Sequence, residues 1–420
     1  MNWTASHLLR PSRRAPWLVG AFALVACGDD SPVDDTGTSG ATSSGVGSPT
    51  AGPSTDPSTD PDPDSTSGAG SSDSGDDPGP GLECETACDS GEILWQVTWG
   101  DAVAWESPWR VSVDAAGRIA VAGISYPPDT WPPSDSFLAL FEPDGTRIQD
   151  LAIDEHVSGA THDVDGTLVV SGETDAGDLW LRRYDGDGGM LWDQVYPYGT
   201  SAYGGSMVIL ANGEIVIGGG TNTAGLLARF GSDGDPLEFS PTQENFYLVA
   251  VAELGEDVVG VGEGVGGTYW AGRLDAEGTA VWSTTGPTSG VHALTVLPDG
   301  RVLAAITNLS QTTDMMTFDP DGTLLASEAL PRAGVEIYDM LVLDDGDLVM
   351  AGAENVSGSH CWLGRLDADN TLVWEISFAE AGGQSQCRTV DLAPDGSLVA
   401  SGGRRPTDFE LDAWLVKLAP

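Results

Sequence analysis

Acidic residues in glycine-containing turns are the first candidates for chemistry in this sequence, since clustered carboxylates bind Ca²⁺. The segment "DGDGG", which begins at Asp185, could open a calcium loop. The EF-hand pattern requires a glutamate at its twelfth position, and counting from Asp185 this position is Tyr196. We therefore predict a hairpin turn with solvated carboxylates, assign no metal, and leave weak cation binding by scattered turns open.

The sequence has five cysteines, and their sulfur atoms offer lipid attachment, disulfide formation or zinc binding. Cys27 ends an apolar N-terminal segment and is considered with that segment below. The other four are an even number, which in an exported protein indicates disulfides: Cys84 with Cys88 inside "CETAC", and Cys361 with Cys387. Zinc binding is the alternative, but the spacing of these cysteines is not that of a zinc ribbon or finger.

Neither the histidines nor any known catalytic motif indicates an active site in this sequence. His156, His162, His292 and His360 occupy non-equivalent places in the repeat described below, so they form no ring of ligands and are predicted to be surface or loop residues. Residues 92–420 contain no nucleophile elbow, phosphate-binding loop or HExxH motif. We find no catalytic constellation and expect a protein that is not an enzyme and needs no cofactor.

Aromatic residues gather in three long connecting segments, "WGDAVAWESPW" from Trp99, "YPPDTWPPSDS" from Tyr126 and "YPYGTSAY" from Tyr196. Loops on a rigid scaffold often carry function, and exposed aromatic side chains are typical binding anchors. The alternative is that these rings only cover the ends of the sheets. The candidate binding residues are Trp99, Trp105, Trp109, Trp131, Tyr198 and Tyr203.

The elements that position these residues come from one repeated unit. An inner hairpin recurs as "DAAGRIAVAG" at Asp114, as "DVDGTLVVSG" at Asp163 and in further copies up to "APDGSLVASG" at Ala393. Asp-Gly and Asn-Gly between alternating apolar runs indicate hairpins in which both turn residues have positive φ. The turn glycines from Gly117 to Gly396 recur about every 46 residues, a period typical of four-stranded propeller blades.

A second hairpin completes each unit and contains a recurring phrase. The phrase reads "RLDAEGTAVW" from Arg273 and "RLDADNTLVW" from Arg365. Identical residues at identical places in a repeat solve the same packing problem. We therefore interpret the phrase as structural, with Trp192, Trp282 and Trp374 at the start of the outermost strand.

The two ends of the repeat array complement each other. The last unit ends at "DAWLVKLAP" without a fourth strand, and a matching strand, "GEILWQVTWG", occurs at Gly91 to Gly100. We predict an all-β, seven-bladed β-propeller over residues 92–420, whose last blade is completed by this N-terminal strand. In such a ring Cys361 and Cys387 lie at the same face of neighbouring blades, where a disulfide can form.

The units resemble the propeller repeats of quinoprotein-like bacterial surface families, in which the pattern "ALD-x-x-x-G-x-x-x-W" recurs at the outer hairpin. The nearest copies here are "RLDAEGTAVW" and "RLDADNTLVW". The resemblance implies either a pyrroloquinoline-quinone oxidoreductase or a tethered propeller lipoprotein without a cofactor. Seven rather than eight blades, and the lack of an adjacent cysteine pair, favour the second.

The N-terminus is typical of an export signal. Arg10, Arg13 and Arg14 precede the apolar run "APWLVGAFALVA", which is too short to span a bilayer, and the segment ends in "LVAC". This ending resembles a bacterial lipobox, so we predict a lipoprotein signal peptide over residues 1–26 and lipid attachment at Cys27. Gly28 is compatible with sorting to the outer membrane, and a plain signal peptide is the alternative.

Composition limits the partners. Residues 27–91 are rich in Ser, Thr, Gly, Pro and Asp and are predicted to be a disordered tether. The whole chain has 64 acidic and 17 basic residues, and its net charge of -47 opposes binding to nucleic acid and favours a soluble monomer. We expect a lipid-anchored envelope protein that binds a protein or glycan through its loop-rich face, with a quinoprotein-like oxidoreductase as the alternative.

Overall fold

The computed structural model describes residues 90–100, 104–126, 135–197, 202–221, 224–244, 246–354, 359–378, 384–407 and 410–420. In these ranges the regular elements are 28 β-strands. The signal peptide, the lipid attachment at Cys27, residues 27–89 of the tether, Cys84 and Cys88 were predicted on residues that lie outside the described ranges. Ser90 and Gly91, the last two residues of the predicted tether, are described and contact Trp374 and Ala419. None of the described segments forms a helix that is long and apolar enough to cross a membrane.

The strands form antiparallel units of four, in which consecutive strands of the chain are neighbours, and we name each unit after its first strand. The first strands are β2 (Trp105–Val113), β6 (His156–His162), β10 (Ala202–Ile209), β14 (Phe246–Leu254), β18 (Gly290–Val296), β22 (Val335–Val342) and β26 (Gln384–Leu392). The second strands are β3 (Ile119–Tyr126), β7 (Leu168–Glu173), β11 (Ile215–Thr221), β15 (Asp257–Gly264), β19 (Val302–Thr307), β23 (Leu348–Glu354) and β27 (Leu398–Thr407). The third strands are β4 (Asp135–Phe141), β8 (Leu179–Tyr184), β12 (Ala224–Phe230), β16 (Thr268–Leu274), β20 (Thr313–Phe318), β24 (His360–Leu366) and β28 (Glu410–Leu418). The fourth strands are β5 (Arg147–Ile153), β9 (Met190–Tyr196), β13 (Pro236–Glu244), β17 (Ala280–Pro287), β21 (Leu324–Ala329) and β25 (Leu372–Phe378).

The remaining strand, β1 (Ile93–Trp99), comes first in the described chain but pairs with the last strand, β28. The two strands are antiparallel, with Thr98 opposite Trp414 and Trp99 opposite Ala413. In this way β1 occupies the fourth-strand position beside β26, β27 and β28. A parallel bridge between Trp105 and Leu411 joins these strands to β2–β5 in one eight-stranded sheet.

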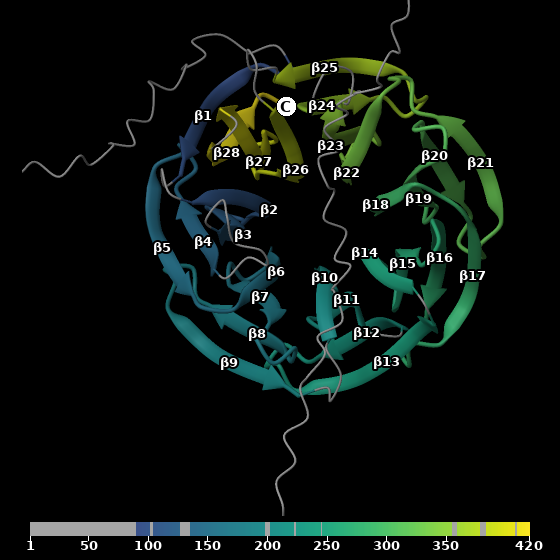
Figure 1. The fold of residues 1–420 in the computed structure, drawn as a ribbon, viewed down its shortest axis with the longest axis horizontal. Helices are drawn as coiled ribbons and strands as arrows, with labels where there is room; N and C mark the ends of the chain where they lie inside the picture. Colours follow the sequence, from purple (N-terminus) through teal and green to yellow (C-terminus); the bar gives the residue numbers. More distant parts are fainter. Residues whose placement is uncertain are drawn as a thin grey trace, which may run out of the picture. The chain divides into compact units, whose positions relative to one another are not determined.

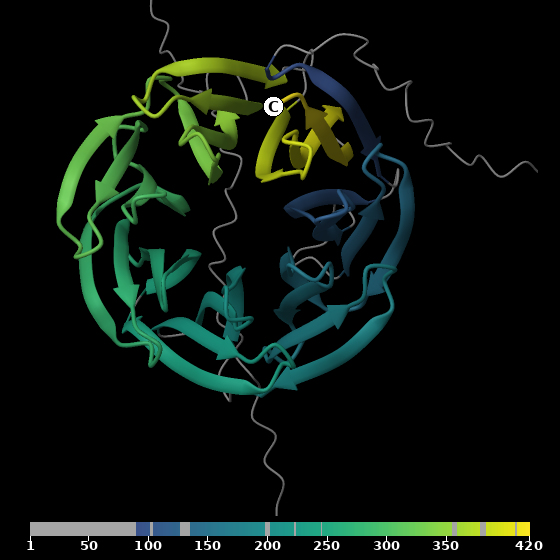
Figure 2. The ribbon, with the colours of Figure 1, turned by 180° about the vertical axis from the view of Figure 1, so that it is seen from behind.

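The units are arranged around a common centre, with the first strands innermost and the fourth strands outermost (Figures 1 and 2). Each first strand packs against the first strand of the next unit, and β26 packs against β2. Repeated four-stranded antiparallel sheets that face one another in this way are a β-propeller. The prediction of an all-β propeller is thereby confirmed.

The inner hairpin turns differ from the prediction in one respect. In the turn at Asp163, the amide of Gly166 donates to the Asp163 carbonyl oxygen, and the amide of Asp163 donates to the Thr167 carbonyl oxygen. Only the glycine has positive φ, 81°, so this is a type I turn followed by a glycine and not a turn with two positive-φ residues. Asn370 takes the glycine's place in "DADNT", with φ 60°, which asparagine tolerates.

The core lies between the faces of adjacent sheets. Tryptophans at equivalent places in four third strands are almost fully buried, namely Trp180, Trp270, Trp362 and Trp414. Between the β22 and β26 units, for example, Leu363 and Val349 pack in one cluster with Leu398 and Trp414. A sheet that is apolar on both faces cannot stand alone, so each unit depends on its neighbours for stability.

The predicted disulfide between Cys361 and Cys387 is present. It links β24 to β26, the first strand of the next unit, and the two Cα atoms are 4.6 Å apart. Both cysteines are fully buried in the core cluster between these two units. The covalent link therefore crosses an interface between sheets rather than a surface loop.

Candidate functional site

Alternating strand directions give every unit two ends. The turns between first and second strands, and those between third and fourth strands, lie at one end, which we call the turn face. The connections between second and third strands, and those that lead into the next first strand, lie at the other end, which we call the loop face. The two faces differ in whether equivalent positions carry the same side chain in every unit.

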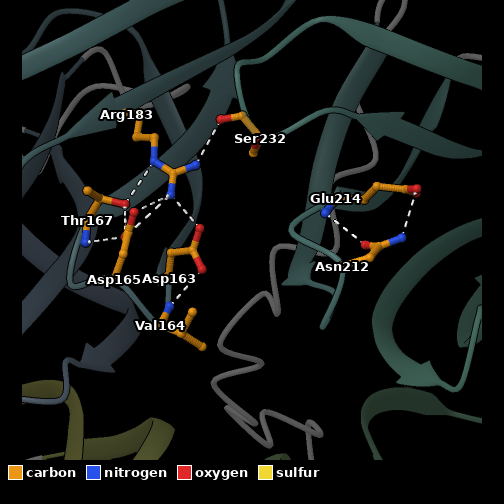
Figure 3. Close-up of polar contacts among 8 residues, drawn as sticks. All are labelled: Asp163, Val164, Asp165, Thr167, Arg183, Asn212, Glu214 and Ser232. Atoms are coloured by element: carbon orange, nitrogen blue, oxygen red, sulfur yellow. Dashed lines mark hydrogen bonds and ion pairs between the residues drawn. The ribbon is translucent and has the colours of Figure 1, made fainter.

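Basic side chains on the third strands fasten the turn face. In the β6 unit, Arg183 forms an ion pair with Asp163 and donates a hydrogen bond of 2.8 Å to the carbonyl oxygen of Ser232 in the next unit (Figure 3). Arg273 likewise contacts its own inner turn and donates to the carbonyl oxygen of Pro320 in the next unit at 3.2 Å. Three more basic residues at this place pair with an acidic side chain of their own inner turn, namely Arg229, Arg365 and Lys417. The arginine of the repeated phrase is therefore structural.

The tryptophan of the repeated phrase is structural too. Trp282 donates from Nε1 to the carbonyl oxygen of Pro320 at 3.0 Å, and its ring covers Gly322 so closely that a Cβ there would lie 2.4 Å away. Trp95 of β1 repeats this contact, with its ring against Gly145 and a 3.1 Å hydrogen bond to the carbonyl oxygen of Pro143. These two tryptophans thus fasten β17 and β1 to the outer turn of the following unit.

The aspartates of the outer turns are satisfied within their own turns. Asp185 accepts backbone hydrogen bonds from Asp187 at 3.0 Å and Gly189 at 2.7 Å through one carboxylate oxygen. The described residues contain no group of three or more His, Cys, Asp or Glu side chains placed to hold a metal ion. The role that the structure gives to the Asp185 carboxylate is to order a hairpin turn.

A β-bulge interrupts every first strand at the same position, and here the side chains do not repeat. The bulged residues are Trp109, Ser158, Gly205, Val249, His292, Tyr338 and Arg388. Bulges re-aim side chains and often lie beside functional sites. Positions that carry the same residue in every unit solve a packing problem that all units share. The seven bulged residues are all different, so a shared packing role does not explain them. The bulges of the innermost strands are therefore the candidate functional site.

Glycines of the second strands make room for these bulges. A Cβ on Gly172 would lie 1.9 Å from the carbonyl oxygen of His156, and a Cβ on Gly402 would lie 1.8 Å from that of Gln386. These are the final glycines of the repeated phrases "VVSG" and "VASG". A glycine inside a strand pattern signals a bulge or a close backbone approach, so the sequence carried a signal for this site that the prediction did not use.

On β18, β22 and β26 the bulges form one aromatic and charged cluster. The ring of Tyr338 contacts His292 edge-on, with centroids 5.3 Å apart, and the guanidinium of Arg388 lies 4.7 Å above the Tyr338 ring. Glu336 accepts hydrogen bonds from His292 Nε2 at 3.0 Å and from the Tyr338 hydroxyl at 3.2 Å. Glu336 is largely buried, which by itself raises its pKa, but the His292 hydrogen bond and charge outweigh burial and hold this pKa below its usual value.

Next to this cluster, polar side chains bind the backbone of other first strands. Asp339 accepts hydrogen bonds from the Thr389 hydroxyl at 2.9 Å and from the Val390 amide at 3.0 Å. Arg110 donates to the carbonyl oxygen of Gly205 on β10 at 2.5 Å, and burial lowers the pKa of its guanidinium. Asp391 accepts from the Val113 amide at 2.7 Å, which connects β26 to β2. These groups are used to hold the inner strands together.

A second cluster lies between β2 and β6. Trp109 contacts the ring of His156 edge-on at 5.4 Å, and His156 is opposite Glu173 in the strand register. Burial raises the pKa of Glu173 to about 7 and lowers that of His156. Among the described residues, Glu173 Oε2 is buried and has no hydrogen-bond partner. A carboxyl group in this state is protonated more readily than a solvated one.

This state predicts a pH-dependent effect of Glu173→Gln. The pKa of Glu173 is about 7 in the folded protein and near 4.5 when unfolded, so the folded state binds more protons and loses stability as the pH rises through this window. We expect the glutamine variant to be more stable than the wild type at pH 8, by about 3 kcal/mol, and no more stable at pH 4.5. Thermal unfolding of both proteins at the two pH values measures this difference.

The matched control is Glu263→Gln. Glu263 occupies the same register position in the β14 unit, opposite Tyr247, and accepts a hydrogen bond from the Tyr247 hydroxyl. Removing this acceptor charge is expected to bring no stabilisation at pH 8. A Glu173→Gln variant that gains no stability at pH 8 would show that the carboxyl group is solvated.

The aromatic residues predicted as binding anchors differ in their burial and in their place in the fold. Trp109 lies at a bulge, and Trp105 is half-buried under the guanidinium of Arg405, 4.4 Å above its ring. Trp99 is only 6% exposed and packs against Phe141 in the core, so the prediction that it is an exposed anchor is wrong. Trp131, Tyr198 and the side chain of Tyr203 lie outside the described parts of the chain.

The histidine prediction also needs a correction. His156 and His292 were predicted to be surface or loop residues, but each lies on a first strand, contacts an aromatic ring and is only partly exposed. Burial lowers the pKa of His162 to about 4, and its backbone amide donates to the Ser112 hydroxyl at 2.9 Å. The prediction rested on the usual exposure of histidine, whereas a residue of a neighbouring first strand covers part of each of these three rings.

Comparisons with known proteins concern the fold alone. No protein-family model matches the sequence, and no curated protein matches it. The structure of the Dos1 propeller is similar, with a TM-score of 0.50 and 12% identity over 77% of this chain and 95% of that chain. A protein of unknown function from Dyadobacter fermentans has a TM-score of 0.49 and 13% identity over 79% of this chain and 100% of its own, and one from Bacteroides caccae has 0.44 and 12% over 58% and 90%. The likeness to the Dos1 propeller agrees with a β-propeller fold and says nothing of activity.

Proposed function

We propose that residues 92–420 form a propeller of seven blades, the last of which is completed by β1. Three observations support this count: the strands fall into units of four, β1 pairs with β28, and β26 packs against β2. Ring closure of this kind leaves no unpaired sheet edge at the joint. The first and last blades would then hold each other in place.

We propose that this propeller is a non-enzymatic binding module that presents the bulged inner strands and the loop face to a protein or glycan. One observation carries the proposal: side chains repeat where the turn face is fastened and differ at every bulge. Side chains that vary on a constant scaffold are what recognition requires. Trp109, Tyr338 and Arg388 are of the residue types that contribute most to binding.

The test compares binding by three forms of the full chain: wild type, Trp109→Ala and Asp187→Ala. The Asp187 side chain is 98% exposed on the turn face and serves as the control. Isolated cell envelopes are treated with protease or with glycosidase before binding is measured as a function of concentration. We expect saturable binding that Trp109→Ala weakens at least tenfold and Asp187→Ala leaves unchanged. Loss of binding only in the Asp187 variant would overturn the proposal.

The alternative function, a quinoprotein-like oxidoreductase, rests on the resemblance of the repeats alone. It predicts that pyrroloquinoline quinone with Ca²⁺ forms a stoichiometric complex with the purified chain and that this complex reduces a dye. The binding-module proposal predicts neither. An active complex would contradict it.

We further propose that the protein is exported, attached to lipid at Cys27 and held at the cell envelope, most simply at the outer membrane, by residues 28–91. The support is the sequence "LVAC" after a basic and apolar leader. Metabolic labelling with a fatty acid is expected to mark the wild type and not Cys27→Ala. Labelling of both proteins to the same extent would remove the lipid anchor and leave a plain signal peptide.

A further inference from the structure

Among the described arginines, two stand out because no hydrogen bond or ion pair joins them to another described residue. In the described ranges every other arginine donates at least one hydrogen bond to a protein atom. Arg388 on β26 and Arg405 on β27 donate none and form no ion pair within the described residues. The chain has 64 acidic residues against 17 basic ones, so carboxylate partners are abundant. Two partly exposed guanidinium groups without one are therefore unexpected.

Both guanidinium groups are nevertheless held in place. Arg388 lies over the ring of Tyr338 at 4.7 Å, and Arg405 lies over the ring of Trp105 at 4.4 Å. Tyr338 belongs to the unit before the β26 unit, and Trp105 belongs to the unit after it. Stacking fixes the plane of a guanidinium while its N–H groups stay available to a planar acceptor. The two arginines thus present preorganised donors on one blade.

We infer that Arg388 and Arg405 bind carboxylate groups of a protein partner, which deepens and rests on the proposed binding function. The nearby carboxylates are already used: Glu336 by His292 and Tyr338, and Asp339 by Thr389 and the Val390 amide. Their negative charge remains, however, and disfavours a dianion such as phosphate more than a single carboxylate. Arginine stacked beside tyrosine and tryptophan is the composition of anchor sites in protein interfaces, which favours an acidic side chain of a protein over an acidic glycan.

The experiment uses the full chain labelled with [15N]arginine, and it follows the guanidinium Nε–Hε signals by NMR. The probes are the blocked tripeptide Ac-Gly-Glu-Gly-NH2, its neutral counterpart Ac-Gly-Gln-Gly-NH2, galacturonate and inorganic phosphate. We expect the signals of Arg388 and Arg405 to shift saturably with the glutamate peptide, with an affinity at least tenfold higher than for the glutamine peptide. Tighter binding of galacturonate or phosphate than of the glutamate peptide would overturn the assignment to a protein carboxylate.

Variants complete the test. Arg388→Met keeps an apolar side chain against Tyr338 but removes the guanidinium group with its N–H donors. Arg388→Lys keeps the positive charge but lacks the planar arrangement of donors. Both variants are expected to lose the peptide-induced shift of the NMR signal at position 388.

Arg301→Met is the control, because Arg301 is exposed on the turn face and paired with Asp299 at 2.6 Å. Equal peptide affinity in Arg388→Met and wild type would refute the inference, and envelope binding that still depends on Trp109 would show that the proposed function itself stands.

Discussion

Deletion of residues 93–100 is expected to lower the thermal unfolding midpoint far more than any point substitution in the protein. This segment contains β1, whose backbone ladder to β28 would be lost together with the packing of Trp99, which is 6% exposed, against Phe141. The contact of Trp95 with Gly145 and Pro143 in the β2 unit would be lost too. Removal of a buried tryptophan side chain alone costs about 3 to 5 kcal/mol. The total is comparable with the whole stability of a typical domain, about 5 to 15 kcal/mol.

The control for this deletion is removal of residues 28–80. Their composition predicts no packed core, so the midpoint is expected to stay unchanged. Calorimetry of the wild type and both truncations measures the effects side by side. Equal midpoints for the two truncations would mean that β1 does not hold the propeller together, and the proposed blade count would fall with it.

Replacement of Cys361 and Cys387 together by alanine should have the second largest effect. The disulfide closes a loop with a sequence separation of 26 residues, and a cross-link of this size stabilises a folded protein by about 3 kcal/mol relative to the open chain. Alanine is chosen because both positions are fully buried among apolar side chains, where serine would bury an additional hydroxyl group.

Denaturant unfolding with and without a reductant checks this prediction. The reductant is expected to lower the wild-type midpoint to that of the double variant and to leave the double variant unchanged. A wild-type midpoint that does not respond to full reduction, confirmed by thiol titration, would show that the link between β24 and β26 contributes nothing to stability.

Much of the fold could be predicted from the sequence because the same hairpin signals recur in each repeat. The glycine turns and the phrase "RLDAEGTAVW" gave the four-strand unit, and the structure shows why the phrase recurs: Arg273 and Trp282 both bond to the Pro320 carbonyl oxygen of the next unit. The matching of "GEILWQVTWG" to the incomplete last unit correctly paired β1 with β28. Turn residues and repeated phrases were sufficient to predict the strands and their pairing within each unit.

The candidate site was harder to predict, because it depends on which side chains the bulges re-aim. Trp99 and Trp109 are both tryptophans in one aromatic segment, yet Trp99 lies in the core on β1, which pairs with β28, and Trp109 lies at the bulge of β2. Arg388 and Arg405 carry no pattern in the sequence at all. What distinguishes them is the lack of a partner, which only the folded arrangement of the described residues reveals.

The central claim is that repeated side chains hold the propeller together, whereas the varied side chains at the bulges serve recognition. Thermal unfolding of Arg273→Met and Arg388→Met tests this division most directly, since the two variants make the same chemical change. Arg273→Met removes an ion pair of 2.6 Å with Asp257 and a hydrogen bond to the next unit, and we expect the midpoint to fall by roughly 5 °C. For Arg388→Met we expect a midpoint within about 1 °C of the wild type, since no polar contact is lost and only the stacking on Tyr338 changes. An equal fall in both variants, or a fall in Arg388→Met alone, would contradict the account.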